Sequence, residues 1–153
     1  MDFELGKFSP AFDEMIEQQA VNEIMELNDD SSLFGLSLTA PEARSLVRQR
    51  ALSLKNNGRI EFGSGLIEKI ILAFYDSPYL SRDDYAETLH GLIEIFYYYK
   101  NETLDQINDD ELISFMKDAF DGICQGSLQL LASREMERFA ENIRFGRERD
   151  FQG

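Results

Sequence analysis

The single histidine of the chain, His90, stands three residues after Glu87 and four residues before Glu94. On a helix this spacing places the three side chains along one face, where carboxylate oxygens and an imidazole nitrogen could bind a metal ion. Helical di-metal carboxylate proteins need a second Glu-x-x-His motif, which a chain with one histidine cannot supply. With Glu61 and Glu68 as further carboxylates, the alternatives are a metal- or ligand-binding bundle and a surface Glu–His pair.

A second group of candidate residues surrounds Gly63-Ser64-Gly65, directly before an apolar segment. Backbone N–H groups at the start of a helix can bind an anion. The segment lacks the lysine and the length of a phosphate-binding loop, so a flexible turn capped by Ser64 is the alternative. Because Arg59 and Glu61 come just before it, Arg59, Glu61, Gly63, Ser64 and Gly65 form the predicted small-ligand site.

Nucleophilic catalysis has little support in the sequence. Cys124 is the only cysteine and lies between Ile123 and Gln125, a setting typical of a buried, inert thiol. An activated thiolate needs a nearby base, and no spacing brings His90 to it. The sequence therefore favours a protein that is not an enzyme, with no catalytic residue assigned and no cofactor expected.

Three consecutive aromatic residues, Tyr97, Tyr98 and Tyr99, follow Phe96. Successive side chains on a helix point about 100° apart, so the three rings cannot all face one core. At least one is expected at the surface, where a large aromatic side chain favours contact with a partner. We predict an interface here.

Charge is segregated along the chain. Residues 1–30 contain nine acidic residues and one lysine, whereas the segment 42–59 is rich in arginine and lysine. Arg44, Arg48 and Lys55 fall close to one helical face. Two alternatives remain open: this face pairs internally with an acidic helix, or it docks an acidic or anionic partner.

These candidate residues depend on helices, which periodic apolar residues and capping residues predict. Helices are expected at 10–27, 41–57 and 66–75, from a capping-box-like start at 81–84 to about 100, and at 109–121, then a short one at 124–131 and a last one capped by Ser133. The segment 66–75 is apolar on nearly every side, as a buried helix would be. Gly91 within a helix predicts a close neighbour. The expected fold is all-α: an irregular bundle of six or seven short helices around a central buried helix at about 66–75.

Length and composition set the class of protein. A chain of 153 residues is expected to form one domain, 1–153, with a frayed charged tail from about 146. Its 15 basic and 29 acidic residues give a net charge of −14, which disfavours nucleic acids and anionic membranes. One cysteine, no signal peptide and no long apolar run predict a cytoplasmic protein. A protein partner or a homo-oligomer is expected.

Several segments are similar to a known family: 58–65, 76–79, 85–89, 96–102, 109–112 and 124–128. Across most of the chain after about residue 40, they resemble a bacterial domain-of-unknown-function family of small acidic proteins. The resemblance implies a bacterial cytosolic protein but brings no activity, ligand or catalytic residue. Together these observations predict a non-enzymatic protein-interaction or regulatory domain in the bacterial cytosol.

Overall fold

The computed structural model describes residues 10–61 and 65–152, and regular secondary structure in these ranges is helical. The all-α prediction is confirmed. η1 is a 3-10 turn and η2 a π-helical segment. The elements are α1 (Pro10–Glu26), α2 (Asn28–Ser31), η1 (Ser32–Phe34), α3 (Ala40–Asn56), α4 (Gly65–Phe74), α5 (Tyr85–Glu102), α6 (Asp109–Asp121), α7 (Leu128–Leu130), η2 (Leu131–Glu135) and α8 (Met136–Gln152).

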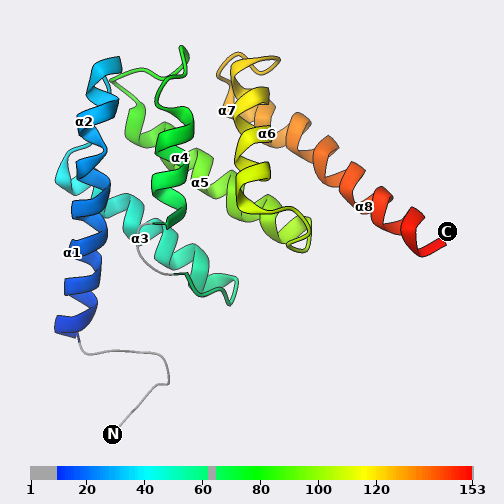
Figure 1. Ribbon diagram of the computed structural model, residues 1–153, viewed down its shortest axis with the longest axis horizontal. Helices are drawn as coiled ribbons and strands as arrows, with labels where there is room; N and C mark the ends of the chain where they lie inside the picture. Colours follow the sequence, from blue (N-terminus) through cyan, green and yellow to red (C-terminus); the bar gives the residue numbers. More distant parts are fainter. Residues whose placement is uncertain (1–9, 62–64, 153) are drawn as a thin grey trace, which may run out of the picture.

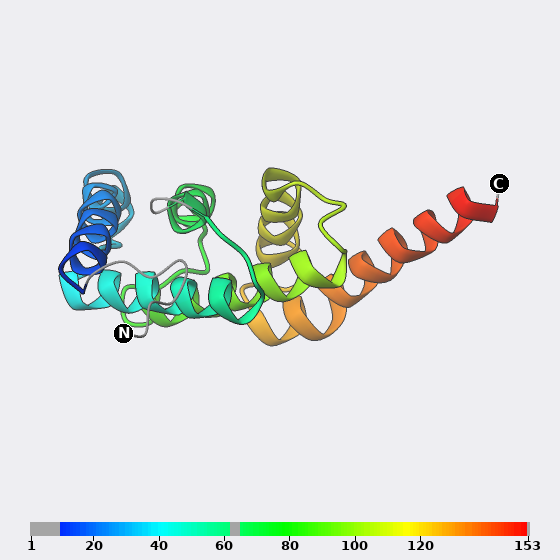
Figure 2. The same cartoon turned by 90° about the horizontal axis from the view of Figure 1, so that it is seen from below.

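The longer helices form two layers. Figure 1 shows α1, α4 and α6 side by side with similar directions, and Figure 2 shows α3, α5 and α8 crossing beneath them. The chain alternates between the layers: α1 packs on α3, α4 and α6 pack on α5, and Phe139 of α8 stacks on Phe115 of α6. The far end of α8 projects beyond the rest of the molecule. The bundle is therefore open at this end.

Local capping signals explain where two of the helices begin. Thr39 and Glu42 form a capping box at the start of α3, in which each side chain accepts a hydrogen bond from the other residue's backbone N–H. The Asn108 side chain accepts from the Glu111 N–H at the start of α6. The segment 92–99, rich in β-branched and aromatic residues, is helical within α5 as predicted.

The core lies where α4 and α5 cross. α5 packs against α3, α4, α6, α7 and α8, so it shares the centre of the fold with α4. One face of α4 is exposed at Leu72, beside α6. The close neighbour predicted at Gly91 is Leu128, whose Cδ1 would lie 2.6 Å from an added Cβ. The buried residues of α4 are Leu66, Ile67, Ile70, Ile71 and Phe74.

In α1, Phe12, Met15 and Ile16 are exposed, whereas the buried residues Ala20, Val21 and Ile24 lie in its second half. One local prediction, at the start of the last helix, was wrong. Ser133 does not cap a helix: it lies inside η2, and its hydroxyl donates to the Gln129 carbonyl at 2.6 Å. α8 therefore continues from the preceding helical turns and is described to residue 152. The frayed tail from about 146 stays a prediction.

Candidate functional site

The connector between α3 and α4 lies against the last turns of α5. The Arg59 guanidinium donates to the Asn101 side chain at 2.9 and 2.6 Å and pairs with Asp105. The Asn101 amide in turn donates to the Asn57 side chain at 2.6 Å. The polar groups of Arg59, a predicted ligand residue, are thus engaged within the protein.

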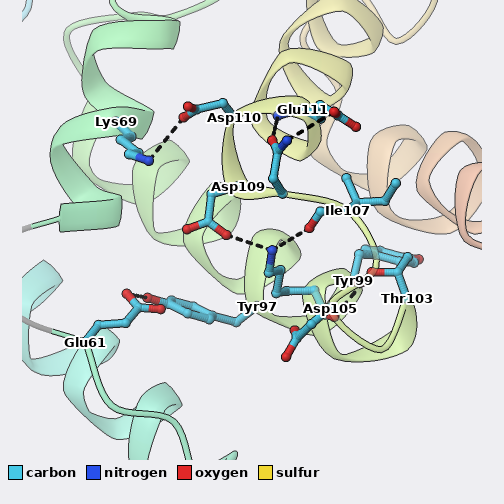
Figure 3. Close-up of polar contacts among 12 residues, drawn as sticks. Glu61, Lys69, Tyr97, Tyr99, Thr103, Asp105, Ile107, Asp109, Asp110 and Glu111 are labelled. Atoms are coloured by element: carbon cyan, nitrogen blue, oxygen red, sulfur yellow. Dashed lines mark hydrogen bonds and ion pairs between the residues drawn. The ribbon is translucent and has the colours of Figure 1, made fainter.

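Glu61 belongs to a second, more buried cluster with Arg50 and Tyr97. Its carboxylate forms an ion pair with Arg50 at 3.2 Å and accepts a hydrogen bond from the Tyr97 hydroxyl at 2.8 Å; Figure 3 shows Glu61 and Tyr97 pointing toward one another. The Arg50 side chain is only 7% exposed. Burial is the main cause that raises the pKa of the Tyr97 hydroxyl, and the Glu61 carboxylate raises it further. The hydroxyl therefore stays protonated and donates. This cluster connects α3, the connector and α5.

The predicted small-ligand site is only partly within the described residues. Gly63 and Ser64 lie outside them, and Gly65 begins α4 close to the Arg50 guanidinium. Arg59 and Glu61 contact α5 at different turns. Because a helix rises about 1.5 Å per residue, their partners Asn101 and Tyr97 lie about 6 Å apart along its axis. Arg59 and Glu61 thus serve two separate contacts rather than one.

His90 lies where α3 crosses α5. Its Nε2 atom is 3.2 Å from the Ser45 hydroxyl, and its backbone carbonyl accepts a hydrogen bond from the Gln49 amide at 2.8 Å. Burial lowers the pKa of the imidazole below 6.5, and the Glu94 carboxylate offsets part of this effect. A neutral His90 therefore fits this helix crossing.

This pKa shift predicts a stability change with pH. Because the folded-state pKa of His90 is lowered, the unfolded chain binds more protons as pH falls below 6.5. The contribution of His90 to the free energy of unfolding is full above that pH and is lost as pH falls through the folded-state pKa. Urea unfolding of the wild type and His90→Gln between pH 7.5 and 5 (about the range of histidine titration) should show a steeper loss for the wild type. Parallel curves of unfolding free energy against pH for the two proteins would contradict this prediction.

A metal site at Glu87, His90 and Glu94 stays a prediction. Within residues 10–61 and 65–152, no group of three or more His, Cys, Asp and Glu side chains is arranged to hold a metal ion. Glu87 and Glu94 are exposed on α5, whereas His90 turns toward α3. Glu61 is bound by Arg50, and Glu68 belongs to α4.

The basic face of α3 packs against the acidic helix α1. Glu17 pairs with Arg44 at 3.0 Å and with Arg48 at 3.1 Å. Of the two alternatives left open by the sequence, internal pairing therefore describes these two arginines. Lys55 is exposed at the far end of α3 and forms no ion pair with the described residues. Docking of a partner on this face stays a prediction, because the Arg48 side chain is still 68% exposed beside Glu17.

The three tyrosines differ sharply in exposure. Tyr97 is 2% and Tyr99 3% exposed, whereas Tyr98 is 54% exposed. This agrees with the expectation that at least one ring would reach the surface. The Tyr98 ring packs edge-on against Tyr99, with ring centroids 4.9 Å apart. Its exposed part belongs to a groove between α5 and the start of α8.

This groove, the Tyr98 groove, has a volume of about 400 Å³. Tyr99 fixes its base by joining the two walls: its hydroxyl contacts the Ala132 carbonyl and donates to the Glu137 carboxylate at 2.8 Å. The Ala132 carbonyl lies in η2, where π-type bonding changes the ordinary helical pattern. The groove is lined by Glu94, Ile95, Tyr98, Tyr99, Ala132, Ser133 and Glu137.

A second groove, of about 390 Å³, lies between α4 and α6 in the other layer. Leu72 and Ala73 lie on one side of it. Its two lysines are paired: Lys69 with Asp110 at 3.1 Å, shown in Figure 3, and Lys117 with Asp76 at 2.6 Å. Because these cations already have partners, this groove offers less unmatched charge to a ligand than the Tyr98 groove.

Sequence reasoning missed two buried charges, Arg50 and Lys100. Lys100 contacts the Ile107 carbonyl and pairs with Asp109 at 2.8 Å, joining the end of α5 to the start of α6; Figure 3 shows Ile107 and Asp109 near one another. A signal was present, because both charges continue an apolar stripe at helical spacing. Arg50 is four residues after Leu46, and Lys100 is four after Phe96.

Cys124 is buried, and burial is the main cause that raises the pKa of its thiol. The Glu135 carboxylate raises this pKa further. A thiol with a raised pKa is a poor nucleophile. This agrees with the inert cysteine expected from the sequence.

The chain matches a family described as "Family of unknown function (DUF6323)" over residues 23–149, and it belongs to this family. The predicted resemblance to a family of unknown function is thereby confirmed. No curated protein and no solved structure matches the chain. In the part of the chain that the structure describes, no helix combines the length and apolarity needed to cross a membrane.

Proposed function

We propose that this chain is a non-enzymatic protein-interaction domain that contacts its partner through the Tyr98 groove. The observation that carries the proposal is the 54% exposure of Tyr98 between two buried tyrosines. A tyrosine ring covers a large contact area with few rotatable bonds, and its hydroxyl can still form a hydrogen bond. The buried Tyr97 and Tyr99 hold α5 in place behind it.

The groove suits a contact surface better than a catalytic site. Its polar lining consists of two tyrosines, one serine and two glutamates, and the Ser133 hydroxyl donates to the Gln129 carbonyl rather than to a general base. The alternative, a metal- or ligand-binding bundle built on Glu61, Glu68, Glu87, His90 and Glu94, stays a prediction, and the residues that the structure describes contain no such group arranged to hold a metal ion. A bacterial cytoplasmic setting remains part of the proposal, supported by the single reduced Cys124.

The test compares two variants that each remove one exposed side chain. Tyr98→Ala removes the ring from the groove, and Leu52→Ala removes a side chain of similar exposure from α3, outside the groove. Each tagged protein is recovered from cells, and co-purifying proteins are identified by mass spectrometry. A candidate partner is then purified, and its affinity for each variant is measured by calorimetry.

We expect a partner that binds the wild type and Leu52→Ala equally well but binds Tyr98→Ala at least about tenfold more weakly, because loss of a central aromatic contact costs about 2 kcal/mol and tenfold is about 1.4 kcal/mol. A second copy of this chain is the other predicted partner, and light scattering would reveal it as a dimer that Tyr98→Ala dissociates. Identical partners and affinities for all three proteins would contradict the proposal.

A further inference from the structure

The Tyr98 groove carries negative charge without a matching cation. Glu94 comes from α5 and Glu137 from α8, so carboxylates enter the groove from both walls. Neither forms an ion pair with any of the described residues, although Glu137 accepts from Tyr99. Glu94 lies four residues before Tyr98 and therefore shares its helix face.

Other contacts between helices of this protein show how such carboxylates are normally matched. Glu17 of α1 is bound by Arg44 and Arg48 of α3. On the same face of α5, one turn beyond Tyr98, Glu102 is bound by Arg144 of α8 at 2.7 Å. In the α5–α8 contact, an arginine thus pairs with Glu102, whereas none of the described residues pairs with Glu94.

The chemistry of the groove selects among cations. An arginine guanidinium is planar, can donate to carboxylates on two sides and stacks on an aromatic ring. A lysine ammonium is a compact charge that makes less use of the exposed Tyr98 face. A phosphate or an acidic peptide would be repelled by Glu94 and Glu137, and by a net charge of −14.

We infer that the Tyr98 groove binds an arginine side chain in a basic segment of a partner protein, the guanidinium stacking on Tyr98 and pairing with Glu94 and Glu137. This rests on the proposed function and names the chemistry of its partner. The net negative charge of the chain would also speed the approach of a basic segment.

The probe is a short fluorescein-labelled glycine-serine peptide that carries arginines. Two sister peptides replace arginine by lysine or by citrulline, which keeps the shape of arginine without its charge. Binding is followed by fluorescence anisotropy at low and at physiological salt. We expect the arginine peptide to bind most tightly, the lysine peptide more weakly and the citrulline peptide weakest.

Matched charge variants distinguish binding in the Tyr98 groove from attraction to the net negative charge of the protein. Glu94→Gln/Glu137→Gln removes the two groove charges, and the glutamine oxygen at 137 can still accept from Tyr99. Glu87→Gln/Glu141→Gln removes two exposed charges from the same two helices, outside the groove. We expect the groove variant to lose about tenfold or more in affinity, since charge-assisted pairs are the strong ones, and the control variant to change less than about twofold.

Equal losses in the two double variants would overturn the inference, because binding would then reflect net charge alone. Binding of the citrulline peptide equal to that of the arginine peptide, or no binding of the arginine peptide, would overturn it as well. A different result would refute the proposed function, namely that no partner protein binds with an affinity that depends on Tyr98. A partner that depends on Tyr98 but is unaffected by Glu94→Gln/Glu137→Gln would leave the proposed function standing and refute the arginine inference.

Discussion

Replacing Glu61 by leucine should lower the free energy of unfolding by about 2–3 kcal/mol. This is at or below the lower end of the roughly 3–5 kcal/mol for breaking a buried ion pair, because the Glu61 side chain is itself 27% exposed. The change leaves the Arg50 guanidinium, 7% exposed, without the Glu61 carboxylate. It also takes the acceptor away from the Tyr97 hydroxyl, which lies at 2.8 Å. Urea denaturation followed by circular dichroism measures the effect.

Two controls make this prediction specific. Glu87→Leu introduces the same residue at an exposed position of α5 and should change stability by less than about 0.5 kcal/mol. Arg50→Met/Glu61→Leu removes both charges and should recover much of the lost stability, since a buried pair replaced by apolar residues is often nearly neutral. A Glu61→Leu protein as stable as Glu87→Leu would show that the cluster does not support the fold.

Replacing Gly126 by alanine should lower the free energy of unfolding by about 3 kcal/mol. This value combines the strain of a left-handed backbone with the cost of overpacking. Gly126 has a φ of +81°, and an added Cβ would lie 2.5 Å from the Tyr79 Cβ. The Tyr79 backbone must move to relieve this contact, because a Cβ cannot swing away as the end of a long side chain can. The turn at Gly126 leads into α7 and then η2, and η2 forms one wall of the Tyr98 groove together with the start of α8.

Gly35→Ala is the matched control. Gly35 has a similar φ of +76°, but nothing lies within 4 Å of an added Cβ. Gly35→Ala should therefore lower the free energy of unfolding only through the strained backbone conformation, by about 1–2 kcal/mol. The difference between the midpoints of the two variants in thermal unfolding isolates the contact with Tyr79. Equal destabilisation by both substitutions would mean that the close approach of Tyr79 to Gly126 is absent in solution.

The helices could be predicted because their signals are local. Caps such as Thr39 and Asn108 act on backbone groups three residues away, and apolar periodicity is read within a single segment. The exposure of one of the three tyrosines followed from the same helical geometry. That it is Tyr98, and that a groove opens beside it, depends on residues 132–137, which pack there from far along the chain.

The contacts that sequence reasoning missed are long-range. Glu61 and Tyr97 are 36 residues apart, and Arg59 and Asp105 are 46 apart. The spacing along the chain does not reveal such pairs, because they depend on how α3, the connector and α5 pack. The same holds for Arg44 and Arg48: an acidic helix and a basic helix can pair with each other or with partners, and only the packing of α1 on α3 decides.

The most direct test of the central proposal, that the Tyr98 groove binds a partner protein, is site-specific photo-crosslinking in living cells. The photoreactive residue p-benzoylphenylalanine replaces Tyr98 in one protein and Leu52 in a matched control. We expect a discrete crosslinked product from position 98, identifiable by mass spectrometry as one protein with a basic segment, and no such product from position 52. An absence of product at position 98, or the same products from both positions, would contradict it.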